Sequence, residues 1–341
     1  MKNLLAVTAA MALLGLGITA QAVTIDTVTV GDAGNAADTT GYGSVAYTYN
    51  IGKYEVTAGQ YTAFLNAVAK TDTDGLYNTN MDTAVSFYGC NIKRSGEAGS
   101  YIYSVASDWA NRPVNYVSFW DSCRFANWQG NGQKTGAQDV TTTEDGAYTL
   151  DGYTGTDGRT IQRNANWKWA VTSEDEWYKA AYYKGGGTNA GYWLYPTQSD
   201  SAPSNQLVNP TNSGNNATYY NNGYTIGSPY YRTEVGAHEK SDSAYGTFDQ
   251  GGNVWEWNEA IRYQDQTHAY RFVRGGSFDF TRSTILQSTF RYYYDGPYSV
   301  ELDAGVGFRV VQAVPEPSTI LVLLSGLGGA LGLLGRCRHQ K

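Results

Sequence analysis

Apolar residues recur at helical spacing near the start of the chain, where Tyr61, Phe64, Leu65 and Val68 stand at i, i+3, i+4 and i+7. Three segments are predicted to be helices, and each begins with a capping motif: 56–70, 117–132 and 171–187. Glycines suggest where two of these helices end, at Gly130 and near Gly185. In each segment a Ser or Thr stands three residues before an acidic or amide side chain, which is the spacing of a capping box. These pairs are Thr57 and Gln60, Ser118 and Asp121, and Ser173 and Glu176.

Alternation of apolar and polar residues is confined to the start of the chain. It covers residues 23–50 and predicts strands joined by a Gly/Asn/Asp turn. The stretches 129–165 and 186–247 are rich in Gly, Asn, Thr, Ser and Tyr and have few apolar runs. Loops of this length inside a domain are usually functional or stabilised by an ion. No repeat and no Gly/Pro linker divides the chain, so one domain is expected.

The composition indicates an exported protein with a weakly charged surface. Charged residues make up 16% of the 341 residues, against roughly 25% in average globular domains. The chain contains 40 Gly and 29 Tyr, and its formal net charge is −7. Because nucleic-acid binding needs a basic face, this balance argues against a nucleic-acid partner.

The first 22 residues have the pattern of a signal peptide. Lys2 precedes an apolar run, and Ala20-Gln21-Ala22 matches an A-x-A cleavage site. The mature domain is therefore expected to span about 23–314. In the oxidising compartment outside the cytoplasm, Cys90 and Cys123 could form a disulfide or remain two buried thiols.

The last segment, 315–341, resembles the PEP-CTERM sorting signal of Gram-negative bacteria that produce exopolysaccharide. It has the Pro315-Glu316-Pro317 turn, an apolar stretch over 319–335 and a basic end. Seventeen residues are about the minimum for a membrane-spanning helix, so transient anchoring is expected. The resemblance implies recognition by exosortase-type machinery at the inner membrane and release to the cell surface or matrix. The basic residues expected on the cytoplasmic side are Arg336, Arg338 and Lys341.

Six segments between 45 and 312 resemble, in order, the formylglycine-generating enzyme (sulfatase-modifying factor) family. They read YEVTAGQYTAFLNAVA, RPVNYVSFWDSCRFANW, TSEDEWYKAAYY, YGTFDQGGNVWEWNEA, RGGSF and GFRVV. The resemblance implies an α+β fold, the formylglycine-generating-enzyme variant of the C-type-lectin fold, with little regular secondary structure. That expectation agrees with the long loops.

The same resemblance implies structural calcium. In family members with oxidase activity, one calcium ion lies beside the Trp-Glu-Trp segment. The matching ligands are the side chains of Asp249 and Glu256 and the backbone carbonyls of Gly252 and Val254. Carboxylates favour a hard cation such as Ca²⁺. A second family calcium site maps to Asn205 and Gln206, although its other ligands do not align.

Alternatives remain open for Glu256, which lies between Trp255 and Trp257. A carboxylate between two indoles is expected to be buried, and a buried charge must be paired or bind a metal. Besides calcium, an ion pair with Arg274 or Arg309 is possible, as is a sugar platform. The two tryptophans themselves are expected to be core residues.

The catalytic part of the family pattern is missing. Active members carry two cysteines five residues apart after the Gly-Gly-Ser, where they bind copper(I). The matching positions here are Phe280 and Ile285, so no copper and no family oxidase chemistry are expected. His238 and His268 stand in polar loops and are expected to be solvated. No catalytic residue can be nominated.

Three classes of function follow. The first is a non-catalytic, calcium-stabilised module that binds a glycan, such as exopolysaccharide, or a surface protein. The second is an enzyme that uses the same scaffold for different chemistry. The third is a matrix component without a discrete ligand. The binding face expected for the first class lies between 278 and 303 and is rich in aromatic and arginine side chains. Its candidate residues are Phe278, Phe280, Arg282, Arg291, Tyr292, Tyr293, Tyr294 and Tyr298.

Overall fold

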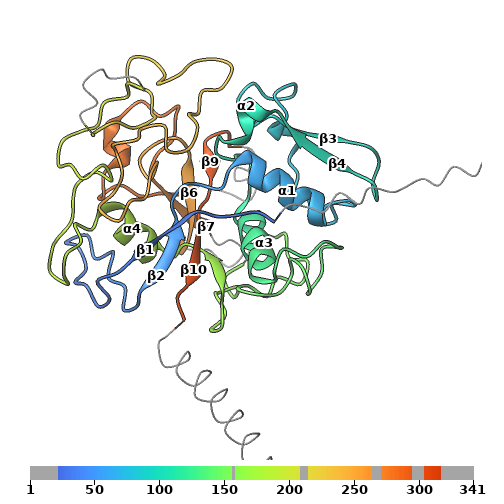
Figure 1. Cartoon of the computed structure of the whole chain (residues 1–341), viewed down its shortest axis with the longest axis horizontal. Coiled ribbons are helices and arrows are strands. Elements are labelled where there is room, and N and C mark those ends of the chain that lie inside the picture. Colours follow the sequence, from blue (N-terminus) through green and yellow to red (C-terminus); the bar gives the residue numbers. More distant parts are fainter. Residues whose placement is uncertain (1–21, 156–157, 208–213, 263–269, 294–302, 316–341) are drawn as a thin grey trace, which may run out of the picture.

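The secondary structure is sparse, and its elements are short. The computed structural model describes residues 22–155, 158–207, 214–262, 270–293 and 303–315 (Figure 1). Long loops join the elements, as the sequence predicts. In chain order the elements are β1 (Thr27–Val30), β2 (Tyr49–Gly52), α1 (Ala58–Val68), η1 (Thr79–Met81), β3 (Ile92–Ser95), β4 (Ile102–Val105), α2 (Ser107–Ala110), α3 (Phe119–Gly130), β5 (Trp169–Val171), α4 (Glu174–Tyr182), β6 (Trp255–Arg262), β7 (Tyr270–Arg274), η2 (Ser283–Leu286), β8 (Tyr292–Tyr293), β9 (Val306–Gly307) and β10 (Val310–Ala313).

The three predicted helices are confirmed, each with its capping box. The side chains of Thr57, Ser118 and Ser173 accept the backbone N–H three residues later, at 3.1–3.2 Å. Helix α3 ends at Gly130, as predicted. Helix α4 ends at Tyr182, before the predicted Gly185, because Tyr183 already has an extended backbone.

Two four-stranded sheets organise the fold. One has the order β1-β2-β10-β5 and is antiparallel throughout. The other has the order β8-β7-β6-β9, and its short β9 runs parallel to β6. The stretch 306–313 therefore supplies a strand to each sheet. Within the predicted strand region 23–50, the structure has β1 and the start of β2, and these two strands pair with each other. The loop between them turns away toward α4, where the Gly43 N–H donates to Asp175.

The helices lie on different sides of the central strands. In Figure 1, α1 and α3 lie together on one side and α4 lies on the other. An aromatic cluster fills the first side, where the rings of Tyr61, Phe64 and Phe125 pack against each other and Phe125 packs against Phe308. Ring pairs of this kind add to the stabilisation that comes from burial alone. The C-terminal Gly-Phe-Arg segment is thus tied to α1 and α3 as well as to the sheets.

The tryptophans and cysteines lie in the core. Trp255 and Trp257 are almost fully buried, and Trp257 donates its Nε1–H to the Val117 carbonyl at 3.0 Å. The prediction that both tryptophans are core residues is confirmed. Cys90 and Cys123 are buried and free, so of the two alternatives the structure has two thiols and no disulfide.

The two terminal signals lie largely outside the described residues. These parts are the signal peptide up to residue 21 and the tail from 316 onward, with the apolar stretch 319–335. Among the residues that are described, no helix combines the length and apolar character needed to cross a membrane. The predicted apolar helix of the tail stays a prediction.

Candidate metal centre

The segment GGNVWEW leads a tight turn into β6. Asp249 and Asn253 both have positive φ angles, +59° and +62°. Gly252 lies between them at φ +91°, and a Cβ there would come within 2.2 Å of the Thr218 carbonyl oxygen. Only glycine fits so close a backbone approach. The turn therefore fixes the direction in which Asp249 and Glu256 point.

Glu256 forms a buried ion pair with Arg309. The guanidinium donates from Nε and Nη2 to the two carboxylate oxygens at 2.5 and 2.6 Å, and both side chains are 0% exposed. Trp177 donates its indole N–H to Oε2 at 2.7 Å. Of the alternatives for Glu256, the ion pair is present, with Arg309 as its partner. Arg274, the other candidate partner, pairs with Glu174 instead.

Asp249 is a buried carboxylate with little compensation. One oxygen accepts the Gly236 backbone N–H at 2.6 Å, and the residue is 8% exposed. Burial raises the pKa of Asp249 to about 6, although the Gly236 hydrogen bond and Arg309 act in the opposite direction. The negative charge at this position is therefore costly unless a cation lies beside it.

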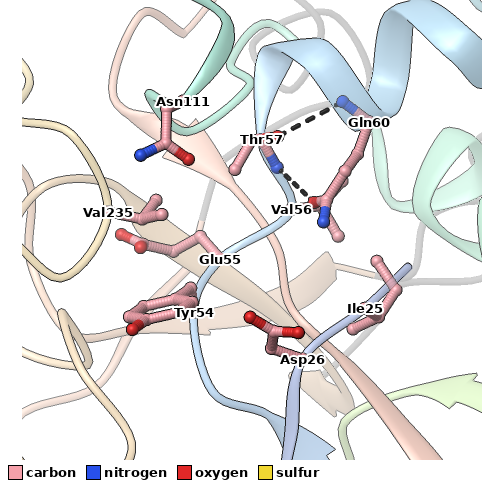
Figure 2. A pocket seen from close by; sticks show the side chains of 9 residues that line it. All are labelled: Ile25, Asp26, Tyr54, Glu55, Val56, Thr57, Gln60, Asn111 and Val235. Atoms are coloured by element: carbon pink, nitrogen blue, oxygen red, sulfur yellow. Dashed lines mark hydrogen bonds between the residues drawn. The ribbon is translucent and has the colours of Figure 1, made fainter. Parts of the chain in front are cut away.

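Glu55 is a member of the same buried group that sequence reasoning missed. It precedes α1 and lines a pocket of about 270 Å³ (Figure 2). The residue is 1% exposed, yet neither carboxylate oxygen has a hydrogen-bond partner in the described part of the chain. Burial, followed by the nearby charges of Asp249 and Glu256, raises the pKa of Glu55 well above its usual range. The only sequence signal is an acidic residue directly before a capped helix, which is too common to be informative.

Three buried carboxylates thus share one guanidinium. Glu55, Asp249 and Glu256 all interact electrostatically with Arg309, and only Glu256 is paired with it directly. Within the described ranges, no group of three or more His, Cys, Asp or Glu side chains is placed to hold a metal ion by itself. A cation at this place would need backbone carbonyls as well as carboxylates, which is the mixed oxygen set that Ca²⁺ accepts.

The second calcium position is built differently. Asn205 donates its side-chain N–H to the carbonyls of Tyr219 and Gly223 at 3.2 and 2.9 Å, and Gln206 is exposed. The Asn205 amide therefore bonds carbonyls of the neighbouring loop, and neither Asn205 nor Gln206 can offer a carboxylate ligand to a cation.

The expectation that His238 is solvated is wrong. The side chain is 4% exposed, and its Nε2 lies 3.0 Å from Thr218 Oγ1. Burial lowers the pKa of His238 to about 4. The reason for the error is that the polar loop around it folds back over the turn before β6. His268 lies outside the described residues.

Hydrocarbon side chains occupy the positions that the family resemblance assigns to cysteines. Phe280 packs edge-on against Trp255 at 5.3 Å between ring centroids. Ile285 belongs to η2 and is 5% exposed. A Cβ added at Gly276 would come within 2.7 Å of the Ile285 Cδ1, so the Ile side chain fills the space beside the Gly-Gly turn.

The expected binding face is only partly at the surface. Phe278 is 1% exposed and packs beneath Tyr88, so the structure places it in the core. Arg291 is half-buried and paired with Glu174, whereas Arg282 is exposed. The remaining candidates divide into the half-buried Phe280, Tyr292 and Tyr293, and Tyr294 and Tyr298, which lie outside the described residues.

Comparison with known protein families gives two matches. Residues 27–314 match the sulfatase-modifying factor enzyme 1-like domain. Residues 313–338 match the PEP-CTERM protein-sorting motif. That motif implies recognition by exosortase-type sorting machinery, and it indicates export to the cell surface or extracellular space of a Gram-negative bacterium. None of the curated proteins matches the chain.

The solved structures to which this chain is similar share little sequence identity with it. CarF is 20% identical, with a TM-score of 0.49 over 86% of this chain and 99% of its own. Treponema denticola variable protein 1 is 17% identical, with a TM-score of 0.49 over 86% and 97%. A Major Tropism Determinant I1 variant is 11% identical, with a TM-score of 0.31 over 77% and 50%.

Proposed function

We propose that the chain, which belongs to the sulfatase-modifying factor enzyme 1-like domain family, is a non-catalytic binding module stabilised by calcium and displayed outside the cell. The observation that carries this proposal is the packing of the side chains that stand where the family resemblance assigns two cysteines. Phe280 and Ile285 offer no thiolate, and both contribute to the hydrophobic core or its edge. Copper(I) prefers soft thiolate ligands, so these side chains cannot replace the cysteine pair.

The calcium part of the proposal rests on uncompensated negative charge. Asp249 and Glu55 are both buried, and the charge of Asp249 acts on Glu55. The nearby guanidinium of Arg309 is already paired with Glu256. We assign the ion to the carboxylates of Asp249 and Glu55, with the carbonyls of Gly252 and Val254 completing the oxygen set. Glu256, although paired with Arg309, also contributes a carboxylate oxygen as a ligand. When bound, calcium would neutralise these carboxylates and tie the α1 entry to the turn before β6.

The ligand part of the proposal concerns the surface around Arg282. Arg282 is exposed. Tyr292 and Tyr293, which follow later in the chain on β8, are half-buried. Arginine and tyrosine side chains both suit contact with a glycan or a polar protein surface. Phe278 has no part in this face because it is buried.

One assay tests the absence of the family chemistry. The copper-supplied protein is incubated with a cysteine-containing peptide, and aldehyde formation is followed by mass spectrometry. We expect no product and no copper(I) uptake. The matched variant is Phe280→Cys/Ile285→Cys, which places two thiols at the family positions and should take up copper(I). Peptide oxidation by the unmodified protein would refute the proposal.

A second assay tests binding. A glycan array and a panel of surface proteins are probed with the protein, with Arg282→Ala and with the control Lys93→Ala, which changes an exposed residue on β3. We expect a ligand whose binding falls in Arg282→Ala and is unchanged in Lys93→Ala. Ligand binding that is as strong in Arg282→Ala as in the unmodified protein would contradict the assignment of this face.

A further inference from the structure

A polar pocket lies at the far end of the β6–β7 hairpin, away from the turn that holds Asp249. It has a volume of about 410 Å³, within the range of small-molecule sites. Strands β6 and β7 form one wall, and the loop before β5 forms the other. The pocket is lined by Tyr148, Ile161, Gln162, Arg163, Glu259, Ile261 and Arg271.

A buried network holds the polar side chains of this pocket in place. Glu259 Oε1 accepts from Arg163 Nε at 2.7 Å and from the Tyr148 hydroxyl. Arg163 continues to Glu176, donating to both carboxylate oxygens at 2.8 Å. Glu176 is 0% exposed and caps α4. A network anchored on a helix cap positions Glu259 and Arg163 without any ligand, so the site is preorganised.

The network leaves one acceptor and one donor unused. The hydrogen bonds that reach Glu259 from the described residues end on Oε1, which leaves Oε2 available. Arg271 is 8% exposed, and its Nε has no hydrogen-bond partner among the residues that the structure describes, although both Nη atoms donate to carbonyls. A buried donor without a partner is costly, so a missing partner is expected here.

The charges of the pocket balance. Arg163, Arg271 and Glu259 line the pocket. Glu176 lies buried behind it and pairs with Arg163, so the two positive and two negative charges of the network cancel and favour neither an anion nor a cation. Ile161 and Ile261 add an apolar surface between the polar groups. A neutral ligand that both donates and accepts hydrogen bonds from one carbon frame satisfies all of these features.

We infer that this pocket binds a neutral saccharide unit. Its hydroxyl groups donate to Glu259 Oε2 and accept from Arg271 and the exposed Gln162 amide, and its C–H face rests on the two isoleucines. This site is separate from the face around Arg282 and goes beyond the proposed function. Carbohydrate binding here requires neither calcium nor Arg282.

The test measures binding of neutral methyl glycosides (of glucose, galactose and mannose) to the purified protein by saturation-transfer NMR and calorimetry. Glucuronic acid and glucosamine serve as charged comparisons. We expect at least one neutral glycoside to bind and the charged sugars to bind more weakly. Glu259→Gln keeps the acceptor for Tyr148 but changes Oε2, and it should weaken binding about tenfold.

Two further variants separate a binding defect from misfolding and from the other site. Gln162→Ala changes an exposed side chain, so it should leave the unfolding temperature unchanged and still weaken binding. Glu97→Gln, on an exposed loop, should change neither. If no neutral glycoside binds, or if binding falls in Arg282→Ala and is unchanged in both Glu259→Gln and Gln162→Ala, this inference is wrong. In that second case the proposed face around Arg282 would stand.

Discussion

The buried pair of Glu256 and Arg309 offers a test in which two partners of one ion pair should behave differently. Arg309→Met removes the guanidinium that interacts with all three buried carboxylates. Glu256→Gln removes one carboxylate and leaves Arg309 beside Glu55 and Asp249. We therefore expect Arg309→Met to be much the more destabilising of the two.

The magnitude follows from the contacts of Arg309. Besides Glu256, its guanidinium donates to the carbonyls of Phe248 and Gly52 at 2.8 and 3.0 Å. Breaking a buried ion pair costs about 3–5 kcal/mol, and each buried carbonyl left without a donor adds about 1 kcal/mol. A loss of roughly 5 kcal/mol is a large part of a typical stability of about 5–15 kcal/mol. The unfolding temperature should fall by roughly 10 °C or more.

The assay is urea and thermal unfolding at pH 7 in the presence of chelator, so that metal binding does not contribute. Arg282→Met, at an exposed arginine, is the control and should lie within about 0.5 kcal/mol of the unmodified protein. Adding Glu256→Gln to Arg309→Met should restore part of the lost stability because it removes an unpaired buried charge. A loss of less than about 1 kcal/mol in Arg309→Met would refute this reasoning, as would a double variant less stable than Arg309→Met alone.

Three other predictions concern the same core. The folded pKa of His238, about 4, lies below its unfolded value, so its contribution is complete above about pH 6.5 and is lost as the pH falls toward 4. Between pH 7 and 5 the unmodified protein should lose roughly 2 kcal/mol more stability than His238→Gln in urea titrations; equal losses would contradict this burial. Gly252→Ala should cost at least about 2 kcal/mol, against about 1 kcal/mol for Gly75→Ala, whose Cβ would meet nothing within 4 Å. Trp177→Phe, which deletes the indole donor to Glu256, should cost about 2 kcal/mol by thermal unfolding, and a neutral effect would show that this hydrogen bond is not stabilising.

Local signals predicted the helices well. A capping box depends on two residues three positions apart, so Thr57, Ser118 and Ser173 could be identified without any tertiary information. Strand β6 gave no such signal. Its first four residues, from Trp255 to Asn258, are all buried, which removes the alternation that marks a half-exposed strand.

The candidate metal centre shows the same limit. Asp249 and Glu256 were identified through the family resemblance, and the partner Arg309 was one of two alternatives. Glu55 and the burial of His238 depend on segments that are distant in sequence and meet only in the folded protein. No periodicity carries that information, because it lies in loops whose paths are set by tertiary contacts.

The most direct test of the account is the effect of calcium on unfolding. The purified protein is heated in millimolar Ca²⁺, in Mg²⁺ and in EGTA, alongside Asp249→Asn/Glu55→Gln. At a calcium concentration of about 100 times Kd, binding adds about 2.7 kcal/mol, so the unfolding temperature of the unmodified protein should rise by several degrees in Ca²⁺ and much less in Mg²⁺. The double variant should lose this response and, in EGTA, be at least as stable as the unmodified protein, because it replaces two carboxyl groups whose ionised forms are disfavoured by burial. An unmodified protein that unfolds at the same temperature in Ca²⁺ and in EGTA would contradict the calcium-stabilised module.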